Sequence, residues 1–386
     1  MIVLQMSLCL VLLIAAGLLL RTLNNLEHIN LGMNTDSLLV FGLNPQQHAP
    51  SDAQSKPFFQ TMVERMRHIP GVQSATAMVH RIGAGWSSNT SVYIDGQKPK
   101  TPDGSFAGVR WNAVGPDFLR TLGVPLLAGR DFNDSDTATS PPAIIVNQTF
   151  VKRYLNGSPA VGHQVALHRP NNMQFTIVGV CGDSKYSAIR EEPRPMAYLP
   201  YTQWTGIDTM QIELRTTGDP ETYWPQVRRA VAEFAPDLPL LTPTTQRQQL
   251  EDTLSQERLF ARLSAFFGAL AVLLVATGLY ATLAYKVARR TPEIGIRMAL
   301  GAQRFDVLWM VLRESLVLCA LAIAIGLPAG FALARLMRSM LYGLQPSDPI
   351  ALTASLAGIA AVALAASFLP ARKASAVDPM VALRCE

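Results

Sequence analysis

Charged side chains are scarce in this chain of 386 residues, because Asp, Glu, Lys and Arg together make up only 16% of it. A soluble globular domain carries about 25%. The deficit is concentrated in four long apolar runs, so the sequence predicts an integral membrane protein with a soluble part. The sequence has no basic stripe with interleaved aromatic residues. We therefore attribute the net charge of +5 to the flanks of membrane segments and not to nucleic-acid binding.

The sequence also lacks the motifs of several enzyme and cofactor classes. It has no GxxxxGK[ST] nucleotide loop, no GxSxG nucleophile elbow and no HExxH metal motif. Cys181 is the only cysteine outside the apolar runs and the C-terminal tail, so no disulfide can form within the soluble part. Asp131, Asp134 and Asp136 lie close together but lack the glycine and distal glutamate of a calcium loop. We therefore expect no catalytic residue, no cofactor and no metal ion.

Each of the four apolar runs is long enough to cross a bilayer, which takes about 20 residues in a helix. The predicted transmembrane helices are residues 1–23, 263–285, 315–333 and 350–369. The first run could be a signal peptide, but it has no charged n-region and no small-residue cleavage site follows it. We therefore expect the first run to remain in the protein as a membrane helix.

Basic residues are distributed unevenly around these helices. The loop of residues 286–306 carries five Lys or Arg and the C-terminal tail three, whereas the loop between the third and fourth helices carries two. By the positive-inside rule, both termini and the 286–306 loop are then cytoplasmic, and the long segment after the first helix is extracytoplasmic. Arg21, on the outer flank of the first helix, is an exception to this pattern.

The long segment of residues 24–243 has an ordinary soluble composition. Strands are predicted at residues 37–43, 72–79, 92–94, 107–114, 143–146, 175–180, 196–199, 210–215 and 238–241, and helices at 56–68, 116–122, 148–155 and 219–234. Strands that alternate with short helices indicate an α+β domain, with two lobes favoured over one. The predicted fold is therefore an α-helical membrane protein with four transmembrane helices and a large extracytoplasmic α+β domain between helices 1 and 2.

A stalk helix is predicted between this domain and the second transmembrane helix, at residues 244–262. The pattern of residues 246–267 is helical throughout and contains no proline. A continuous helix here would transmit motion between the soluble domain and the membrane. A connection without any such role fits the same pattern equally well.

The polar stretch of residues 286–306 contains a further short helix, predicted at residues 292–300. Thr291 is the expected N-cap, Pro292 the first helical residue and Gly301 the C-cap. Glu293 and Arg297 are spaced for an ion pair on one helical face. The helix either lies against lipid or docks into a groove of a cytoplasmic partner. The candidate docking residues are Arg290, Thr291, Pro292, Glu293, Ile294, Gly295, Ile296, Arg297, Met298, Leu300 and Gly301.

The third apolar run contains two glycines four residues apart, Gly326 and Gly330, with Pro328 between them. Small residues at this spacing allow a neighbouring helix to approach closely, and a proline permits a kink. We expect ordinary helix packing here; a hinge or a dimer face is the functional alternative.

The order of these parts resembles the MacB/FtsX-type permeases of bacterial ABC transporters. The phrases that carry the resemblance are VGPDFLRTLGVPLLAGRDF at 114–132, AIIVNQTFVKRYL at 143–155, IVGVCGDSKY at 177–186, EEPRPMAYLPY at 191–201, RTPEIGIRMALGA at 290–302 and FLPARKASAVDPM at 368–380. The resemblance implies a MacB-like periplasmic core domain at residues 24–243 and an FtsX-like permease domain at 263–386. It also implies the bacterial inner membrane as the location.

The resemblance further implies a function and a set of partners. The chain would be a permease subunit that couples ATP hydrolysis by a cytoplasmic ABC ATPase to periplasmic rearrangement and export, with the 292–300 helix as the coupling helix. A second permease unit, as a homodimer partner or a paralogous half, membrane lipid and a periplasmic adaptor are the other expected partners. The alternative is an FtsX-like regulator of cell-wall hydrolases that transports nothing. Unlike MacB itself, this sequence has no nucleotide-binding motif.

Overall fold

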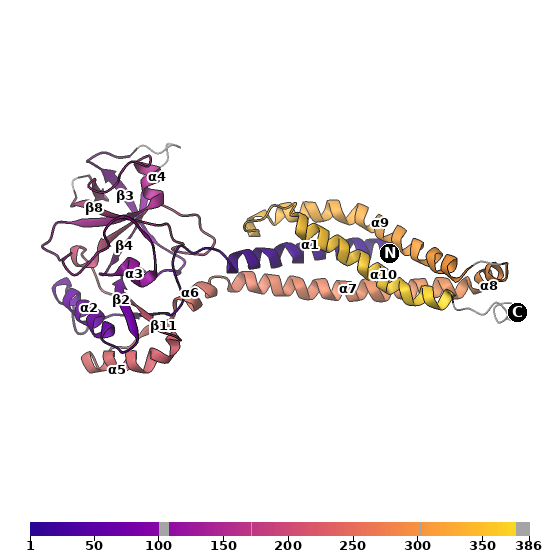
Figure 1. Cartoon of the computed structure of the whole chain (residues 1–386), viewed down its shortest axis with the longest axis horizontal. Coiled ribbons are helices and arrows are strands. Elements are labelled where there is room, and N and C mark those ends of the chain that lie inside the picture. Colours follow the sequence, from indigo (N-terminus) through magenta and orange to yellow (C-terminus); the bar gives the residue numbers. More distant parts are fainter. Residues whose placement is uncertain (100–107, 171, 301–302, 376–386) are drawn as a thin grey trace. The chain divides into compact units, whose positions relative to one another are not determined.

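The computed structural model describes residues 1–99, 108–170, 172–300 and 303–375, and the chain divides into two compact units (Figure 1). The first, called here the helical unit, comprises Met1–His28 and Ser255–Glu386. The second, called the sheet unit, comprises Ile29–Leu254. The two ends of the sequence thus form one unit, and a segment of mixed secondary structure forms the other.

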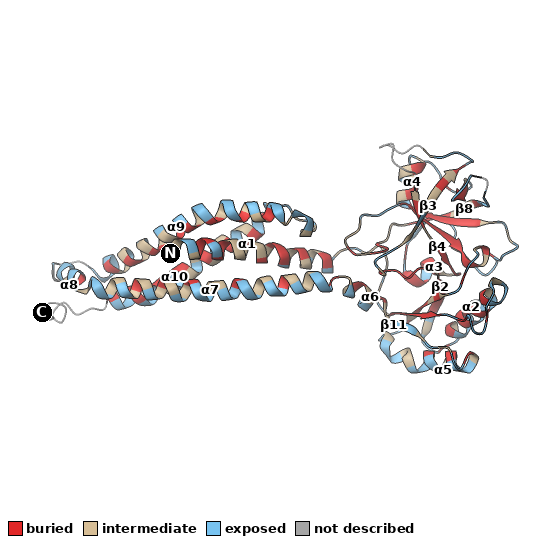
Figure 2. Cartoon of the chain, turned by 180° about the vertical axis from the view of Figure 1, so that it is seen from behind, coloured by how far each residue is buried: buried red, intermediate tan, exposed pale blue. Residues whose placement is uncertain are grey.

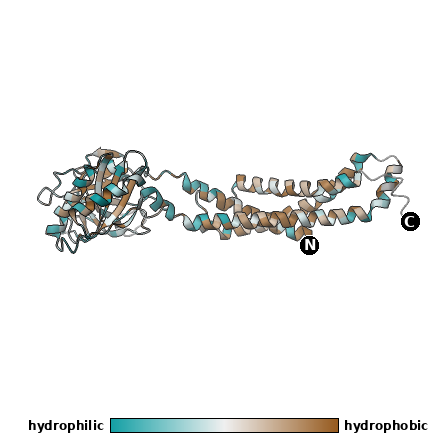
Figure 3. Cartoon of the chain, turned by 90° about the horizontal axis from the view of Figure 1, so that it is seen from below, coloured by the Kyte–Doolittle hydropathy of each residue, from teal (hydrophilic) through white to brown (hydrophobic). Residues whose placement is uncertain are grey.

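In its described residues, the helical unit contains four long helices and two short ones. They are α1 (Ile2–Glu27), α7 (Ser255–Arg289), α8 (Thr291–Ala299), α9 (Arg304–Leu336), η3 (Arg338–Met340) and α10 (Pro349–Ser375). Among the described residues, α1, α7, α9 and α10 are long and apolar enough to cross a membrane, and they are predominantly brown in Figure 3. α7 has 35 residues and is about 52 Å long at 1.5 Å per residue. It therefore exceeds the hydrocarbon thickness of about 30 Å.

α1 is the central helix of this unit, in contact with α7, α9 and α10. Met6, Leu10, Ile14 and Leu18 recur every four residues along it and are buried, which gives α1 its red colour in Figure 2. A helix that packs against one neighbour needs only one apolar face. α1 packs against three helices and buries residues on several sides. This explains why its sequence is apolar all round.

Gly326 and Gly330 lie on the side of α9 that faces α1. A Cβ atom added at Gly326 would lie 2.9 Å from the backbone oxygen of Ser7, and one at Gly330 would lie 2.6 Å from Cδ1 of Ile14. The hydroxyl of Ser7 donates a hydrogen bond to the carbonyl of Ala322 at 3.0 Å. The small-residue face of α9 is therefore covered by α1 of the same chain. Pro328 lies inside the same unbroken helix.

Arg21, the exception to the charge pattern, has a partner within the helical unit. Its guanidinium forms an ion pair with Asp348, which directly precedes α10. The same carboxylate accepts a hydrogen bond from the backbone N–H of Ala351 at 2.9 Å and so caps the start of α10. The charge of Arg21 is thus balanced by a residue that the chain brings from 327 positions away.

The sheet unit contains strands and short helices in alternation. They are β1 (Leu38–Leu43), α2 (Asp52–Arg67), β2 (Val72–Met78), β3 (Ser88–Ile94), β4 (Gly108–Val114), α3 (Phe118–Leu122), β5 (Leu126–Gly129), β6 (Ala143–Asn147), α4 (Gln148–Tyr154), β7 (Gln164–Leu167), β8 (Gln174–Cys181), β9 (Met196–Pro200), η1 (Tyr201–Gln203), β10 (Met210–Thr216), η2 (Pro220–Tyr223), α5 (Trp224–Phe234), β11 (Leu241–Thr245) and α6 (Gln246–Asp252).

The strands form one path of pairings with two distinct parts. β11, β1, β10 and β2 form an antiparallel sheet, and β4, β3, β7, β8, β6 and β9 follow, with β9 pairing back onto β4 to close a ring. The two parts are joined through a single residue pair, Met78 and Val114. β4–β9 and β6–β8 are parallel, whereas the other pairings are antiparallel. The unit is therefore mixed α/β and not the segregated α+β arrangement that the sequence predicted.

Helices cover both faces of the four-stranded part. α2 and α5 pack on the face that carries Phe41 and Ile212, and α3 packs on the opposite face with Met78. Successive residues of a strand point to opposite faces, so both faces of these strands are apolar. This explains the nearly continuous apolar sequence of β1, in which every residue is buried.

The predicted stalk helix is interrupted, so its predicted continuity is wrong. α6 ends at Asp252 and α7 begins at Ser255. Between them the backbone makes two tight turns, from the N–H of Thr253 to the carbonyl of Leu250 and from the N–H of Leu254 to that of Glu251. The hydroxyl of Thr253 also donates to the carbonyl of Leu250 at 2.6 Å. Such local bonds of threonine compete with the helix and end it without a proline or glycine.

Several strands also differ from the prediction. The last strand, β11, lies at Leu241–Thr245 and not at residues 238–241. β5 and β7 were not predicted, and β3 begins at Ser88, four residues before the predicted strand at 92–94. In β5, all four residues are exposed, so neither alternation nor burial marks it in the sequence.

Candidate functional site

The candidate site is α8 together with the ends of α7 and α9 that hold it, all within the helical unit (Figure 1). Arg290 is the N-cap, in place of the predicted Thr291, and it makes no side-chain capping bond. Thr291 is already helical, and its hydroxyl donates to the carbonyl of Val287 in α7 at 3.0 Å. The Thr291 hydroxyl can reach the last carbonyls of α7 because only Arg290 separates α7 from α8. The predicted C-cap, Gly301, lies outside the described residues.

The apolar residues of α8 divide between two sides of the helix. Ile294 is 1% exposed and belongs to the core of the helical unit, and Met298, one turn later, packs against that core. Ile296 is half exposed and Leu300 is 83% exposed. Pro292, Ile296 and Leu300 follow one another at intervals of four residues, so these exposed residues form one apolar stripe along the helix. We call them the exposed stripe.

An ion pair lies on the exposed side of α8. The carboxylate of Glu293 accepts a hydrogen bond from Nη2 of Arg297 at 2.6 Å, and both side chains are about half exposed. The other terminal nitrogen of Arg297 contacts Sδ of Met310 in α9 at 3.4 Å. An exposed pair at this spacing contributes only about 0.3–0.5 kcal/mol to helix stability. The pair mainly holds the two charged side chains in place beside the exposed stripe.

Glu314 of α9 ties the junction of α7 and α8 to α9. Its carboxylate pairs with Lys286 of α7 and lies 4.0 Å from Nη1 of Arg290. A small cleft of about 20 Å³ is lined by these charged groups together with Ile294. The sequence analysis missed Glu314 as a site residue. Glu314 could have been noticed in the sequence, because it is an acidic residue directly before the third apolar run and close to a strongly basic loop.

α8 is therefore a short helix held rigidly on one side and open on the other. Ile294 anchors it in the core, and Glu314 fixes the connection that precedes it. Among the described residues, the side that faces outward presents apolar groups bordered by one acidic and one basic side chain. A groove on another protein binds a helix through apolar residues spaced in this way.

Comparison with known proteins identifies the family. A model of the MacB-like periplasmic core domain matches residues 2–232, and a model of the FtsX-like permease C-terminal domain matches residues 265–379. The chain is a MacB/FtsX-type ABC transporter permease. Both matched families are membrane components, and α1, α7, α9 and α10 are consistent with them.

Several curated relatives carry the name macrolide export ATP-binding/permease protein MacB. The relative from Rhodopseudomonas palustris (strain HaA2) is 26% identical over 75% of this chain and 46% of its own length. The relative from Shewanella sp. (strain ANA-3) is 28% identical over 76% of this chain and 47% of its own length. The chain thus spans about half the length of the curated relatives it matches.

A search of solved structures also finds similarity to part of this chain. The periplasmic region of MacB from Actinobacillus actinomycetemcomitans is 15% identical, with a TM-score of 0.38, and the match covers 60% of this chain and 99% of that one.

Proposed function

We propose that this permease couples ATP hydrolysis by a cytoplasmic ABC ATPase to rearrangement of a periplasmic sheet unit, and thereby drives export. α8 is the coupling helix. The observation that carries the proposal is the exposed stripe on a helix whose other side is fixed by Ile294 and Glu314. A load applied to such a helix moves α7 and α9 with it, because the anchored side leaves little freedom for local adjustment.

The proposed orientation places α8 and both termini in the cytoplasm and the sheet unit in the periplasm. The basic residues around α8 support it through the positive-inside rule. The pairing of Arg21 with Asp348 also supports it, because it balances one of the basic residues on the proposed outer side. A second permease unit and a periplasmic adaptor complete the proposed assembly.

Two leucines of nearly equal exposure test this orientation. Leu300 is 83% exposed, next to α8, and Leu336 is 82% exposed, at the opposite end of α9. In a cysteine-free background, we expect Leu300→Cys to react with a membrane-impermeant maleimide only in inverted vesicles, and Leu336→Cys only in right-side-out vesicles. Labelling of Leu300→Cys from the outside would refute both the orientation and the role of α8.

A further inference from the structure

A cavity of about 670 Å³ lies within the sheet unit, between α2 and the segment of residues 133–138. Cavities that bind small organic molecules have about 300–1,000 Å³. This one combines charged side chains with an apolar wall made of small or rigid residues. The apolar wall consists of Ala53, Pro57, Val63, Pro116 and Ala138.

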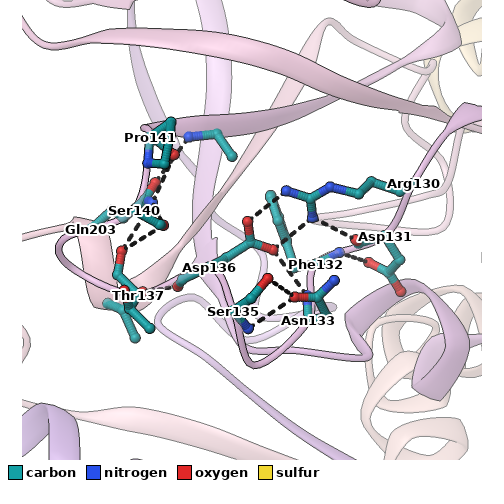
Figure 4. A network of polar contacts seen from close by, with 12 residues as sticks. Arg130, Asp131, Phe132, Asn133, Ser135, Asp136, Thr137, Ser140, Pro141 and Gln203 are labelled. Atoms are coloured by element: carbon teal, nitrogen blue, oxygen red, sulfur yellow. Dashed lines mark hydrogen bonds and ion pairs between the residues drawn. The ribbon is translucent and has the colours of Figure 1, made fainter.

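The walls of the cavity are fixed before any ligand binds. The carboxylate of Asp136 accepts two hydrogen bonds from Arg130, at 2.7 and 2.8 Å, and a third from the N–H of Asn133 at 3.0 Å. Figure 4 shows these side chains pointing toward one another across the loop. On the other side of the cavity, the ammonium of Lys56 donates to the carbonyl of Thr202 at 3.0 Å and joins α2 to η1.

Tyr201 is a buried polar side chain that lines this cavity and lacks a partner. It is only 2% exposed, and in the part of the chain that the structure describes its hydroxyl makes no hydrogen bond. Burial raises the pKa of Tyr201, and the charges of Arg67 and Asp134 act on it. The hydroxyl is thus a neutral group beside charged neighbours. A ligand in the cavity that hydrogen-bonds to this hydroxyl would gain affinity.

The charge at the cavity is unbalanced. The guanidinium of Arg67 is shared by three carboxylates, those of Asp117 at 3.2 Å, Glu64 at 3.4 Å and Asp134 at 3.7 Å. Four carboxylates line the cavity, those of Asp52, Glu64, Asp134 and Asp136, against two cations, Lys56 and Arg67. Glu64 and Asp134 are mostly exposed. The negative excess favours a cationic ligand group at this end.

We propose that the cavity is a binding site for an amphipathic amine, with the ammonium at Glu64 and Asp134, a polar group at Tyr201 and the apolar body against Pro57 and Val63. Anionic ligands are disfavoured by the same carboxylates. The site lies in the sheet unit and does not depend on the role of α8, so either proposal can fail without the other.

The test uses the whole permease in lipid nanodiscs and the fluorescent amine dansylcadaverine, with the signal of empty nanodiscs subtracted. We expect saturable binding with enhanced fluorescence, and binding at least tenfold weaker for the N-acetyl derivative, which has no positive charge. Asp134→Asn and Tyr201→Phe should each raise the Kd about five- to tenfold. Glu233→Gln, which removes an exposed carboxylate on α5 outside this cavity, should change it less than twofold.

Tyr201→Phe removes one oxygen atom only, and its unchanged circular dichroism would show that the fold is intact. Absence of saturable binding by the wild-type protein would overturn the proposal. Equal binding of the amine and its acetylated form would also overturn it, as would equal Kd values for the wild-type protein, Asp134→Asn and Tyr201→Phe.

Discussion

Replacing Leu300 by aspartate should lower the ATPase activity that depends on this permease by at least tenfold. In the proposed complex, the exposed stripe enters an apolar groove of the ATPase, and a carboxylate there would be buried without a partner. A tenfold loss corresponds to about 1.4 kcal/mol, and an unpaired charge in an apolar contact costs more than that. Folding should be unaffected, because Leu300 is 83% exposed. The measurement is ATP hydrolysis by the reconstituted complex of permease and ATPase.

Two further variants make this result specific. Leu336→Asp places the same charge at a leucine of equal exposure at the other end of α9 and should leave ATPase activity unchanged. Ile296→Asp, within the exposed stripe, should reproduce the loss. If Leu300→Asp and Ile296→Asp hydrolyse ATP as the wild-type complex does, α8 is not the coupling helix.

The second large effect concerns Glu213, at the centre of β10. Its side chain is 0% exposed, and neither of its carboxylate oxygens has a hydrogen-bond partner among the described residues. Burial raises the pKa of Glu213 from 4.5 to about 8, although the positive charges of Arg81 and Arg215 oppose this shift. At neutral pH the folded protein therefore holds a proton here that the unfolded chain releases.

The sign of the pH dependence follows from this difference in proton binding. Between pH 4.5 and about 8, the folded state binds one proton more than the unfolded state at this group. Its contribution to the free energy of unfolding therefore falls as the pH rises, by about 1.4 kcal/mol per pH unit. Glu213→Gln removes the titrating group and should flatten this slope, so the variant should be less pH-sensitive than the wild-type protein.

Urea unfolding of the full chain at pH 5, 6.5 and 8, followed by tryptophan fluorescence, measures this effect. Four of the five tryptophans belong to the sheet unit, so the signal reports mainly on that unit. Glu233→Gln, at an exposed carboxylate, is the control and should keep the wild-type slope. A slope that is the same in Glu213→Gln as in the wild-type protein would mean that Glu213 is ionised in the folded state.

Sequence reasoning reached the family and the number of apolar runs because these depend on local patterns. It could not predict that Ile294 is buried and Ile296 exposed. Both residues are apolar, and only the packing of α8 on α7 and α9 decides which of them is buried. Similarly, the alternation in β10 predicts a solvent-facing Glu213, but strands covered on both faces bury it. The break at Thr253 depends on one side-chain hydrogen bond, which no periodicity reveals.

The ion pairs of the site could likewise be predicted only in part from the sequence. Glu293 and Arg297 could be paired from their spacing alone, because they lie on one helix. Glu314 and Lys286 are 28 residues apart, and their pairing depends on how α7 and α9 meet. Arg21 and Asp348 are a still more distant example. Interactions within an element are thus readable from the sequence, and those between elements are not.

Crosslinking from a single cysteine at position 296, in native membranes and a background without the native cysteines, tests the central proposal most directly. Ile296→Cys lies in the exposed stripe, and Ile294→Cys, two residues away but buried, is the matched control. We predict a crosslink from position 296 to a cytoplasmic ABC ATPase that changes in yield with ATP, and none from position 294. A cysteine at position 296 that is accessible from the cytoplasm but crosslinks to no ATPase, with or without ATP, would contradict the account.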